Sequence, residues 1–282
     1  MLCFSSNVNH SPTFSYGHRL NTREDFVKHV VNKVFQSNNS PKILEIGPYM
    51  SPLLSDVDFD TFDVLTYEQL VKRSTEEGGP SHLIPEVTWV GPQATQKYIH
   101  ETYDLILSSH VVEHQTDLIK HFQEIGRLLR PGGIYAALIP DHRYCYDYFN
   151  TPSKVSDVLS AYWRTPSNHT FDNFLEDRLT TGHNNTLEYW KNNPGIPKWK
   201  AMEWSDVEKL VAAYLELTDS GTYLDVHAWK FTNETFSDIL SALVRWRLVS
   251  LEILEIFPTR YPNNEFWVVL SKNLLEEAIS SI

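Results

Sequence analysis

The sequence predicts an α/β fold built on a doubly wound, mostly parallel sheet, and three observations lead to this class. Short apolar runs of strand length alternate with segments of helix length. The run YDLILSS at 103–109 is apolar without alternation, as in strands buried on both faces of a parallel sheet. With 282 residues, 41% of them apolar, the chain can bury a large core.

The N-terminal half supplies a helix and four strands. Residues 22–35 (TREDFVKHVVNKVF) predict a helix, because a threonine cap and first-turn acids precede apolar residues at helical spacing. The run KILEIG at 42–47 predicts the first strand, which ends in a glycine–proline turn. Residues 58–64 and 87–90 predict the second and third strands, and 103–109 the fourth.

A helix and three further strands follow. The segment TDLIKHFQEIGRLLR at 116–130 places its apolar residues on one helical face and stops at a proline–glycine–glycine turn. IYAALIP at 134–140 then predicts the fifth strand. A helix capped at Thr232 or Asn233 precedes the strands predicted at 251–258 and 265–272.

About ninety residues separate the fifth strand from that last helix, far more than an ordinary connection, which indicates a lid or subdomain. The stretch 204–217 predicts an amphipathic helix within it. We expect most of its aromatic rings to form the insertion's own core, although flat rings with a polar group also suit a sugar or an aromatic acceptor. Its five tryptophans are Trp163, Trp190, Trp199, Trp204 and Trp229.

Composition argues against several classes of partner. Lys and Arg total 24 against 36 Asp and Glu, and the net charge of -12 disfavours nucleic acids and anionic membranes. No stretch holds eighteen consecutive apolar residues and the N-terminus does not resemble a secretory signal, so we expect a cytoplasmic location. Cys3 and Cys145, far apart in sequence, predict neither a disulfide nor a cysteine metal site.

The pentad HVVEH at 110–114 matches the H-x-x-E-H spacing of zinc hydrolases. That chemistry needs two histidines one turn apart within a helix, yet His110 directly continues a strand. No third ligand is evident, although Asp141 and His142 could converge on the pentad. We therefore expect no metal, keep zinc hydrolysis as an alternative, and expect Glu113 and His114 at the start of the following helix.

Four segments, in order, carry a resemblance to a known family. LEIGP at 44–48, Asp63, YDLILSSHVVEH at 103–114 and RLLRPGGIYAALIPD at 127–141 resemble class I S-adenosylmethionine-dependent methyltransferases. The resemblance implies a seven-stranded sheet whose last strand is antiparallel, with S-adenosylmethionine as cofactor. IPDHRYCYDYF and HAWKFT are also similar to a bacterial subgroup associated with sugar or polysaccharide genes, which implies methyl transfer to oxygen of a sugar or related small metabolite.

The same resemblance assigns the cofactor pocket. Gly47 would abut the methionyl portion, with Glu45 steadying the turn, while Asp63 would accept hydrogen bonds from the ribose hydroxyls. Tyr49 and Ser51 stand where the family usually has further glycines. The cofactor-binding candidates, from the first strand to the fourth, are Glu45, Gly47, Pro48, Asp63, Gln93, Ser109 and His110.

Methyl transfer from a sulfonium is an in-line displacement, so the protein aligns the acceptor, excludes water and takes the acceptor's proton. A histidine near its neutral form suits that last role. The candidates for base and orienting group are His142, Asp141 and His110. The candidates for acceptor binding are Arg143, Tyr144, His227 and Trp229.

These assignments divide the chain into an N-terminal arm and helix at 1–41, a cofactor-binding core at 42–144, a substrate-binding insertion at 145–232 and closing elements at 233–282. Two rival functions remain besides zinc hydrolysis. A protein that binds S-adenosylmethionine without methylating is compatible with every motif. A nicotinamide dehydrogenase is disfavoured, because G-x-G-x-x-G is missing after the first strand. The oligomeric state is not predicted.

Overall fold

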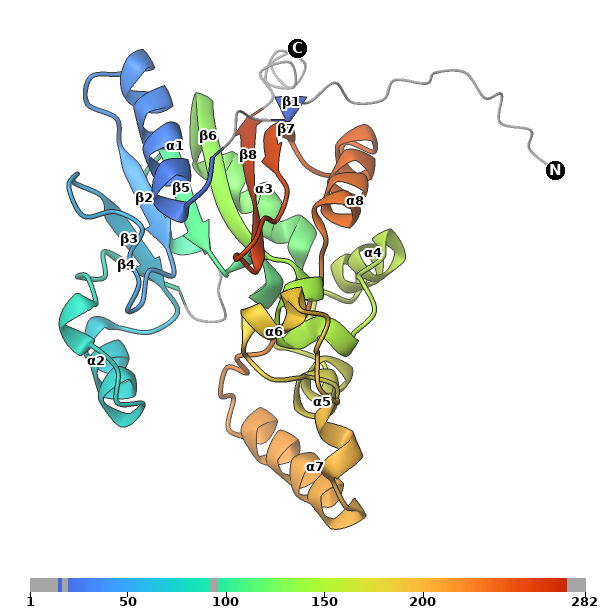
Figure 1. Ribbon diagram of the computed structural model, residues 1–282. Helices are drawn as coiled ribbons and strands as arrows, with labels where there is room; N and C mark the ends of the chain where they lie inside the picture. Colours follow the sequence, from blue (N-terminus) through green and yellow to red (C-terminus); the bar gives the residue numbers. More distant parts are fainter. Residues whose placement is uncertain (1–14, 17–19, 92–95, 273–282) are drawn as a thin grey trace.

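The computed structural model describes residues 15–16, 20–91 and 96–272 and shows one sheet flanked by helices (Figure 1). Across these residues the sheet has eight strands in the order β1-β7-β8-β6-β5-β2-β3-β4. The strands are β1 Ser15–Tyr16, β2 Ile43–Ile46, β3 Asp60–Asp63, β4 Trp89–Val90, β5 Tyr103–Ser109, β6 Leu129–Pro140, β7 Leu251–Phe257 and β8 Glu265–Lys272.

The predicted seven-stranded sheet is confirmed in strands β2 to β8. Strands β2 to β6 pair in parallel, and β8 runs antiparallel to both of its neighbours, β6 and β7. Numbered from β2 along the chain, the order is 3-2-1-4-5-7-6. The two-residue strand β1, parallel to β7 at the edge, is an addition that the sequence did not predict.

Helices cover both faces of this sheet. The α-helices are α1 Arg23–Ser37, α2 Tyr67–Glu76, α3 Leu118–Leu128, α4 Val155–Arg164, α5 Phe171–Leu179, α6 Thr186–Trp190, α7 Trp204–Asp219 and α8 Asn233–Arg245. The 3-10 turns are η1 Ser81–Leu83, η3 Gln96–Tyr98, η4 Val112–His114, η5 His142–Tyr144, η6 Tyr146–Phe149 and η7 Lys198–Ala201. Helix α2 and the short helices of the insertion were not predicted.

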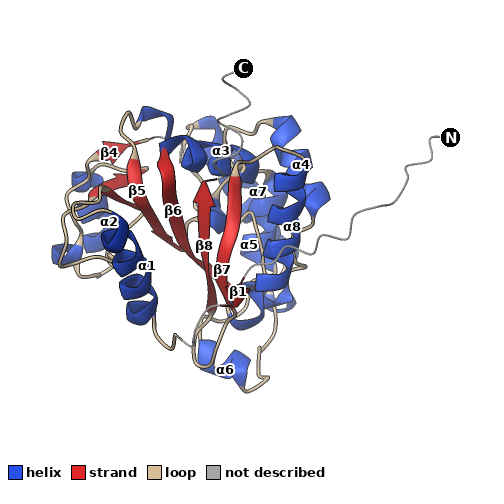
Figure 2. Ribbon diagram, turned by 90° about the horizontal axis from the view of Figure 1, so that it is seen from above, coloured by secondary structure: helices blue, strands red, loops and turns tan. Residues whose placement is uncertain are grey.

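The two faces of β5 pack against different helices because successive side chains of a strand point in opposite directions. Leu105 and Leu107 join the cluster formed with Phe26 and Val30 of α1. Ile106, between them, joins the larger cluster that contains α3 and α8. Figure 2 shows α1 on one side of the sheet and α3 and α8 on the other. The core is therefore divided into two apolar layers, one on each face of the sheet.

Helix α3 shows why the sequence specified this packing. Asp117 caps it by accepting a hydrogen bond from the Lys120 amide at 3.0 Å. Apolar residues then recur at helical spacing and are almost completely buried against the sheet. They are Leu118, Ile119, Phe122, Ile125 and Leu128. The expectation that Glu113 and His114 begin this helix is wrong, because the chain forms turn η4 before Asp117 supplies the cap.

Strand β6 is longer than the predicted strand at 134–140. It begins at Leu129, directly after α3, and its register against β5 jumps from the pair Tyr103–Leu129 to the pair Leu105–Ile134. The intervening Arg130-Pro131-Gly132-Gly133 therefore forms a bulge, in which Gly132 adopts a positive φ of 78°. The expectation that this segment stops the helix is wrong, because α3 already ends at Leu128 and the chain is extended from Leu129.

The insertion lies between β6 and β7, and its helices α5, α6 and α7 gather at one end of the molecule (Figure 1). Its separate buried cluster contains Phe174, Leu224 and Val226. The expectation that most of the insertion's rings form its core is wrong for three tryptophans, with exposed fractions of 81%, 52% and 72%. These are Trp163, Trp199 and Trp204.

Candidate functional site: a cavity at the carboxyl ends of β2, β3 and β5

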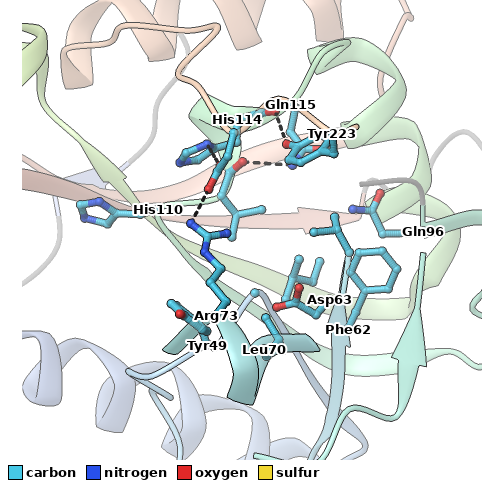
Figure 3. A pocket seen from close by; sticks show the side chains of 15 residues that line it. Tyr49, Phe62, Asp63, Leu70, Arg73, Gln96, His110, His114, Gln115 and Tyr223 are labelled. Carbon is cyan, nitrogen blue, oxygen red and sulfur yellow. Dashed lines mark hydrogen bonds and ion pairs between the residues drawn. The ribbon is translucent and has the colours of Figure 1, made fainter. Parts of the chain in front are cut away.

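An open cavity lies where β2, β3 and β5 end, on either side of the point where the strand order reverses. Open α/β sheets bind ligands at this place. Figure 3 shows side chains of the sheet edge, α2 and the insertion converging on it. The lining residues are Ile46, Gly47, Tyr49, Phe62, Asp63, Val64, Leu70, Arg73, Gln96, His110, Val111, His114, Gln115, Tyr223 and Asp225.

Gly47 turns the chain at the end of β2. Its φ is +66°, and a Cβ added there would lie 2.9 Å from Cγ2 of Val111, so a side chain is excluded by conformation and by space. Glu45, 1% exposed, accepts a hydrogen bond from the Leu53 amide at 2.8 Å and thereby holds the following loop. Burial raises the pKa of this carboxyl to about 7. Pro48 is buried beside the turn and does not line the cavity.

Asp63 ends β3 with its side chain on the cavity wall (Figure 3). It is 7% exposed and accepts a hydrogen bond from the Leu65 amide at 3.1 Å. Burial raises the pKa of the carboxyl to about 6, although hydrogen bonds from the backbone of Leu65 and Val64 oppose this shift. The carboxylate therefore retains acceptor capacity toward a ligand in the cavity.

His110 follows β5 in the left-handed region, with φ of 54°, and lines the cavity. Its Nε2 lies 2.8 Å from Oε2 of Glu265 on β8, which also accepts a hydrogen bond from Arg23 Nε at 2.7 Å through Oε1. Burial alone would raise the pKa of Glu265, yet these two partners lower it to about 2. Ser109 ends β5 outside the cavity lining, and Gln93 lies outside the described residues.

The residues predicted after the fifth strand are engaged with one another. Asp141, completely buried, accepts hydrogen bonds from the Arg143 guanidinium at 2.9 and 2.7 Å and from the Thr259 hydroxyl at 2.7 Å. Tyr144 stacks on Trp190 with ring centroids 3.8 Å apart. His142 does not line the cavity, and burial lowers its pKa. This group anchors the start of the insertion to the sheet.

His227 and Trp229 lie behind the cavity wall and not on it. His227, 3% exposed, contacts Asp147 through Nδ1 at 2.5 Å and the Tyr146 hydroxyl through Nε2 at 2.6 Å. Trp229 donates its indole N–H to the carbonyl of Gln115 at 2.5 Å. The irregular segment that leads back from the insertion is thus fastened to the junction between β5 and α3.

Several lining residues escaped the sequence analysis. Arg73 of α2 pairs with Asp225 of the insertion at 3.0 Å, so the ion pair links the core to the insertion beside the cavity. Tyr223 donates to the His114 carbonyl at 3.3 Å. Gln96, 1% exposed, has no hydrogen-bond partner for Nε2 among the described residues. The threonine cap at Thr66 could have predicted α2, but no local pattern marks the other residues.

Comparisons with known proteins were made against families, curated proteins and solved structures. The methyltransferase domain family matches residues 47–137, about a third of the chain. No curated protein matches. None of the helices in the described residues is long and apolar enough to cross a bilayer.

Among solved structures, an S-adenosylmethionine-dependent methyltransferase from Clostridium acetobutylicum ATCC 824 aligns with 11% identity over 90% of this chain and 93% of its own, at a TM-score of 0.47. The CcbJ methyltransferase from Streptomyces caelestis aligns with 12% identity over 89% of this chain and 94% of its own, at a TM-score of 0.43. The CurJ carbon methyltransferase aligns with 11% identity over 89% of this chain and 54% of its own, at a TM-score of 0.44. These identities and scores carry no information on the acceptor. The strand order and the antiparallel β8 give the chain the class I methyltransferase fold, and residues 47–137 match the methyltransferase domain family.

Proposed function

We propose that this chain is an S-adenosylmethionine-dependent methyltransferase that acts on the oxygen of a small acceptor, a sugar or a related metabolite. The observation that carries the proposal is the cavity at the strand-order reversal, with Gly47 at the end of β2 and Asp63 at the end of β3. A match to the methyltransferase domain family over residues 47–137, which begins at Gly47 and includes β3 and β5, supports it.

The cavity lining fits the cofactor's parts. Gly47 leaves the backbone uncovered for a close approach, and the buried Asp63 carboxylate can accept hydrogen bonds from two neighbouring ribose hydroxyls. Phe62 and Leu70 provide an apolar wall for a flat base. Gln96 offers an unpartnered, buried amide N–H₂ toward that side, which suits a ring nitrogen acceptor. When bound, S-adenosylmethionine supplies an electrophilic methyl group.

His110 is our proposed general base among the three catalytic candidates, because it lines the cavity whereas Asp141 and His142 do not. The carboxylate of Glu265 lies 2.8 Å from its Nε2 and stabilises the imidazolium that forms when the ring takes the acceptor's proton. A histidine and an acceptor hydroxyl form a suitable pair for proton transfer near neutral pH. This arrangement supports an oxygen acceptor. Tyr223 and Asp225 bring the insertion to the same cavity and provide the acceptor's side of it.

Calorimetric titration with S-adenosylhomocysteine, the expected product, tests the cofactor pocket. Wild type should bind one molecule per chain, and Asp63→Asn should weaken binding about 10–100-fold, since hydrogen bonds to a charged group contribute roughly 1.5–3 kcal/mol. Asp58→Asn, an exposed aspartate just before β3, is the matched control and should bind as wild type does.

Labelled S-adenosylmethionine with a panel of sugar acceptors then tests the reaction, and His110→Ala should lower turnover without abolishing cofactor binding. If the folded wild type does not bind the product, the cofactor assignment is wrong. Binding without methylation of any acceptor would instead favour a non-methylating cofactor-binding protein.

A further inference from the structure

Glu113 is a buried acid without a hydrogen-bond partner among the described residues. Its side chain, on turn η4, is completely buried, and neither carboxylate oxygen has a hydrogen-bond partner among the described residues. No lysine or arginine pairs with it within the same residues, although Arg73 and Lys230, elsewhere in the region, pair with Asp225 and Glu176. An unpaired buried carboxylate is strongly unfavourable, so this position calls for a cation.

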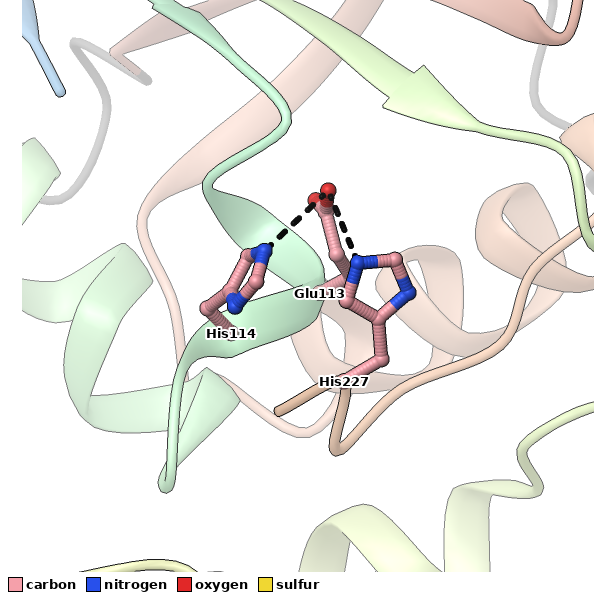
Figure 4. Close-up of side chains that lie close together, drawn as sticks. All are labelled: Glu113, His114 and His227. Atoms are coloured by element: carbon pink, nitrogen blue, oxygen red, sulfur yellow. Dashed lines mark ion pairs between the residues drawn. The ribbon is translucent and has the colours of Figure 1, made fainter. Parts of the chain in front are cut away.

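Three histidines bring a ring nitrogen near that carboxylate, and the first, His110, has its Nδ1 3.8 Å from Oε1 of Glu113. Nε2 of His114 and Nε2 of His227 each lie 3.8 Å from Oε1 of Glu113 (Figure 4). This distance is too long for a hydrogen bond. A proton shared between Glu113 and the ring of His114 or His227 therefore does not account for these distances. An ion between Glu113, His114 and His227 would contact all three side chains.

His114 and His227 each also have a carboxylate at the other ring nitrogen. Nδ1 of His114 lies 3.0 Å from Asp225, and Nδ1 of His227 lies 2.5 Å from Asp147. Because an ionised carboxylate only accepts, the N–H of each ring belongs at Nδ1, which leaves a lone pair on each Nε2. Metal-binding histidines almost always have such a partner, which fixes the tautomer and orients the ring.

We infer that Glu113, His114 and His227 bind one divalent transition metal ion of the zinc class. Their ligand atoms all lie within 4.8 Å of one another. Bonds of roughly 2.0–2.2 Å would place tetrahedral ligand atoms about 3.4 Å apart, so the ligand atoms must approach one another by up to about 1.4 Å for the ion to bind. Imidazole and carboxylate suit zinc and its neighbours. Three protein ligands also leave one position open for water or another oxygen.

The backbone already holds the ligands in place. The Glu113 carbonyl accepts hydrogen bonds from the amides of Ala228 at 2.7 Å and Trp229 at 3.1 Å, directly after His227. The turn after β5 and the irregular segment that contains His227 are thus joined without the ion. His110, the first histidine of the HVVEH pentad, does not belong to this group of three. The inferred site therefore differs from the zinc-hydrolase pattern and does not depend on the proposed methyl transfer.

One contact competes with the ion. The Tyr146 hydroxyl, 2.6 Å from Nε2 of His227, donates to the lone pair that the ion would use. Burial strongly raises the pKa of this phenol, so it remains a neutral donor. The Tyr146→Phe variant removes the competitor and leaves all three ligands, and it should bind the ion at least as tightly as wild type does.

The test is calorimetric titration of Zn²⁺ into tag-free, chelator-dialysed protein without S-adenosylmethionine, followed by visible absorption of the Co²⁺ form. Wild type should take up one ion per chain with a Kd in the micromolar range or below. Glu113→Gln and His227→Gln should each weaken binding at least about 100-fold, since losing an outer partner alone costs roughly 10–100-fold. His100→Gln, an exposed histidine outside the cluster, should bind as wild type does.

Glu113→Gln also tests the site without metal. It is nearly isosteric and removes a buried unpaired charge, so the metal-free variant should unfold at or above the midpoint of metal-free wild type. The inference fails if wild type binds no Zn²⁺, or if folded Glu113→Gln and His227→Gln retain its affinity. Because no cofactor is present, neither result depends on whether the chain methylates anything.

Discussion

The sheet and the insertion bury their side chains in different ways, although both line the same cavity. The sheet and its helices share two large apolar clusters, in which α3 buries a complete helical face. Val158 of α4 and Ala228, Trp229 and Phe231 near the end of the insertion belong to the larger of these clusters. The rest of the insertion has a buried cluster of three residues of its own, and three of the insertion's five tryptophans are exposed. Its longest helix, α7, has no fully buried residue. The sheet's core therefore includes both ends of the insertion, whereas the middle part, with α5 to α7, packs separately and less completely.

The cavity has one half formed by strand ends and one half formed by the insertion, and the two halves are held in place in different ways. Gly47 and Asp63 sit at the ends of buried strands, where the sheet fixes their positions. Tyr223 and Asp225 lie in the irregular stretch after α7 and reach the cavity through a hydrogen bond and ion pairs. We expect substitutions in the two halves to separate cofactor binding from acceptor binding.

The largest expected effect distinguishes the two cores. Phe122→Ala on α3 should reduce the free energy of unfolding by about 3–5 kcal/mol, because the fully packed site around it cannot collapse. Phe174→Ala, an equally buried phenylalanine of the insertion's small cluster, should cost less, below about 3 kcal/mol. Trp163→Ala, at an exposed ring, should stay within about 0.5 kcal/mol. Urea denaturation measures all three, and equal losses for both phenylalanines would show that the small cluster around Phe174 is packed as completely as the sheet's core.

The next effect concerns the turn after β2. Gly47→Ala forces a left-handed φ on a residue with a side chain, which costs roughly 1–2 kcal/mol, and its Cβ would meet Val111. We expect S-adenosylhomocysteine affinity to fall at least about 10-fold, since the turn and Val111, which both line the cavity, must move apart. Gly221→Ala is the matched control. It imposes the same strain of a positive φ on a residue outside the cavity, where the new side chain meets open space. If both variants lose equal affinity, strain alone explains the result.

The pH dependence of cofactor binding tests Asp63 directly. Its pKa of about 6 lies above the ordinary 3.8, so the cofactor-free fold gains stability from this group as pH falls through 6 toward 4. Ligand affinity should change in the opposite direction, because hydroxyl donors need the ionised carboxylate. Between pH 7 and pH 5 we expect S-adenosylhomocysteine to bind up to about 10-fold more weakly. Asp63→Asn should lose this part of the dependence, and an unchanged profile in the variant would assign it to other groups, including Glu45.

The sequence predicted the half of the site that regular structure positions. Gly47 and Asp63 could be located because strand ends and turn residues are local signals. Asp225 is more than 100 residues further along, in a stretch without periodicity, and a local pattern does not tell which loop returns to a cavity. His227 was predicted to bind the acceptor, but its burial behind the cavity depends on how the insertion folds back. The same fold-back brings His227 beside Glu113 and His114, where it offers the third ligand that was not evident for HVVEH in the sequence.

The smallest expected effect comes from the ion pair between Arg73 and Asp225, which joins the halves of the cavity. Both side chains are about two-fifths exposed, so the pair should contribute no more than about 1 kcal/mol to folding. Asp225→Asn should leave S-adenosylhomocysteine affinity within about 3-fold of wild type, because Asp63 and Gly47 are unchanged. The same variant should weaken Zn²⁺ binding by roughly 10–100-fold, since Asp225 orients His114. Calorimetry with each ligand separates these effects. If Asp225→Asn impaired product binding as much as Asp63→Asn does, the insertion would belong to the cofactor site, and the division between the two halves would not hold.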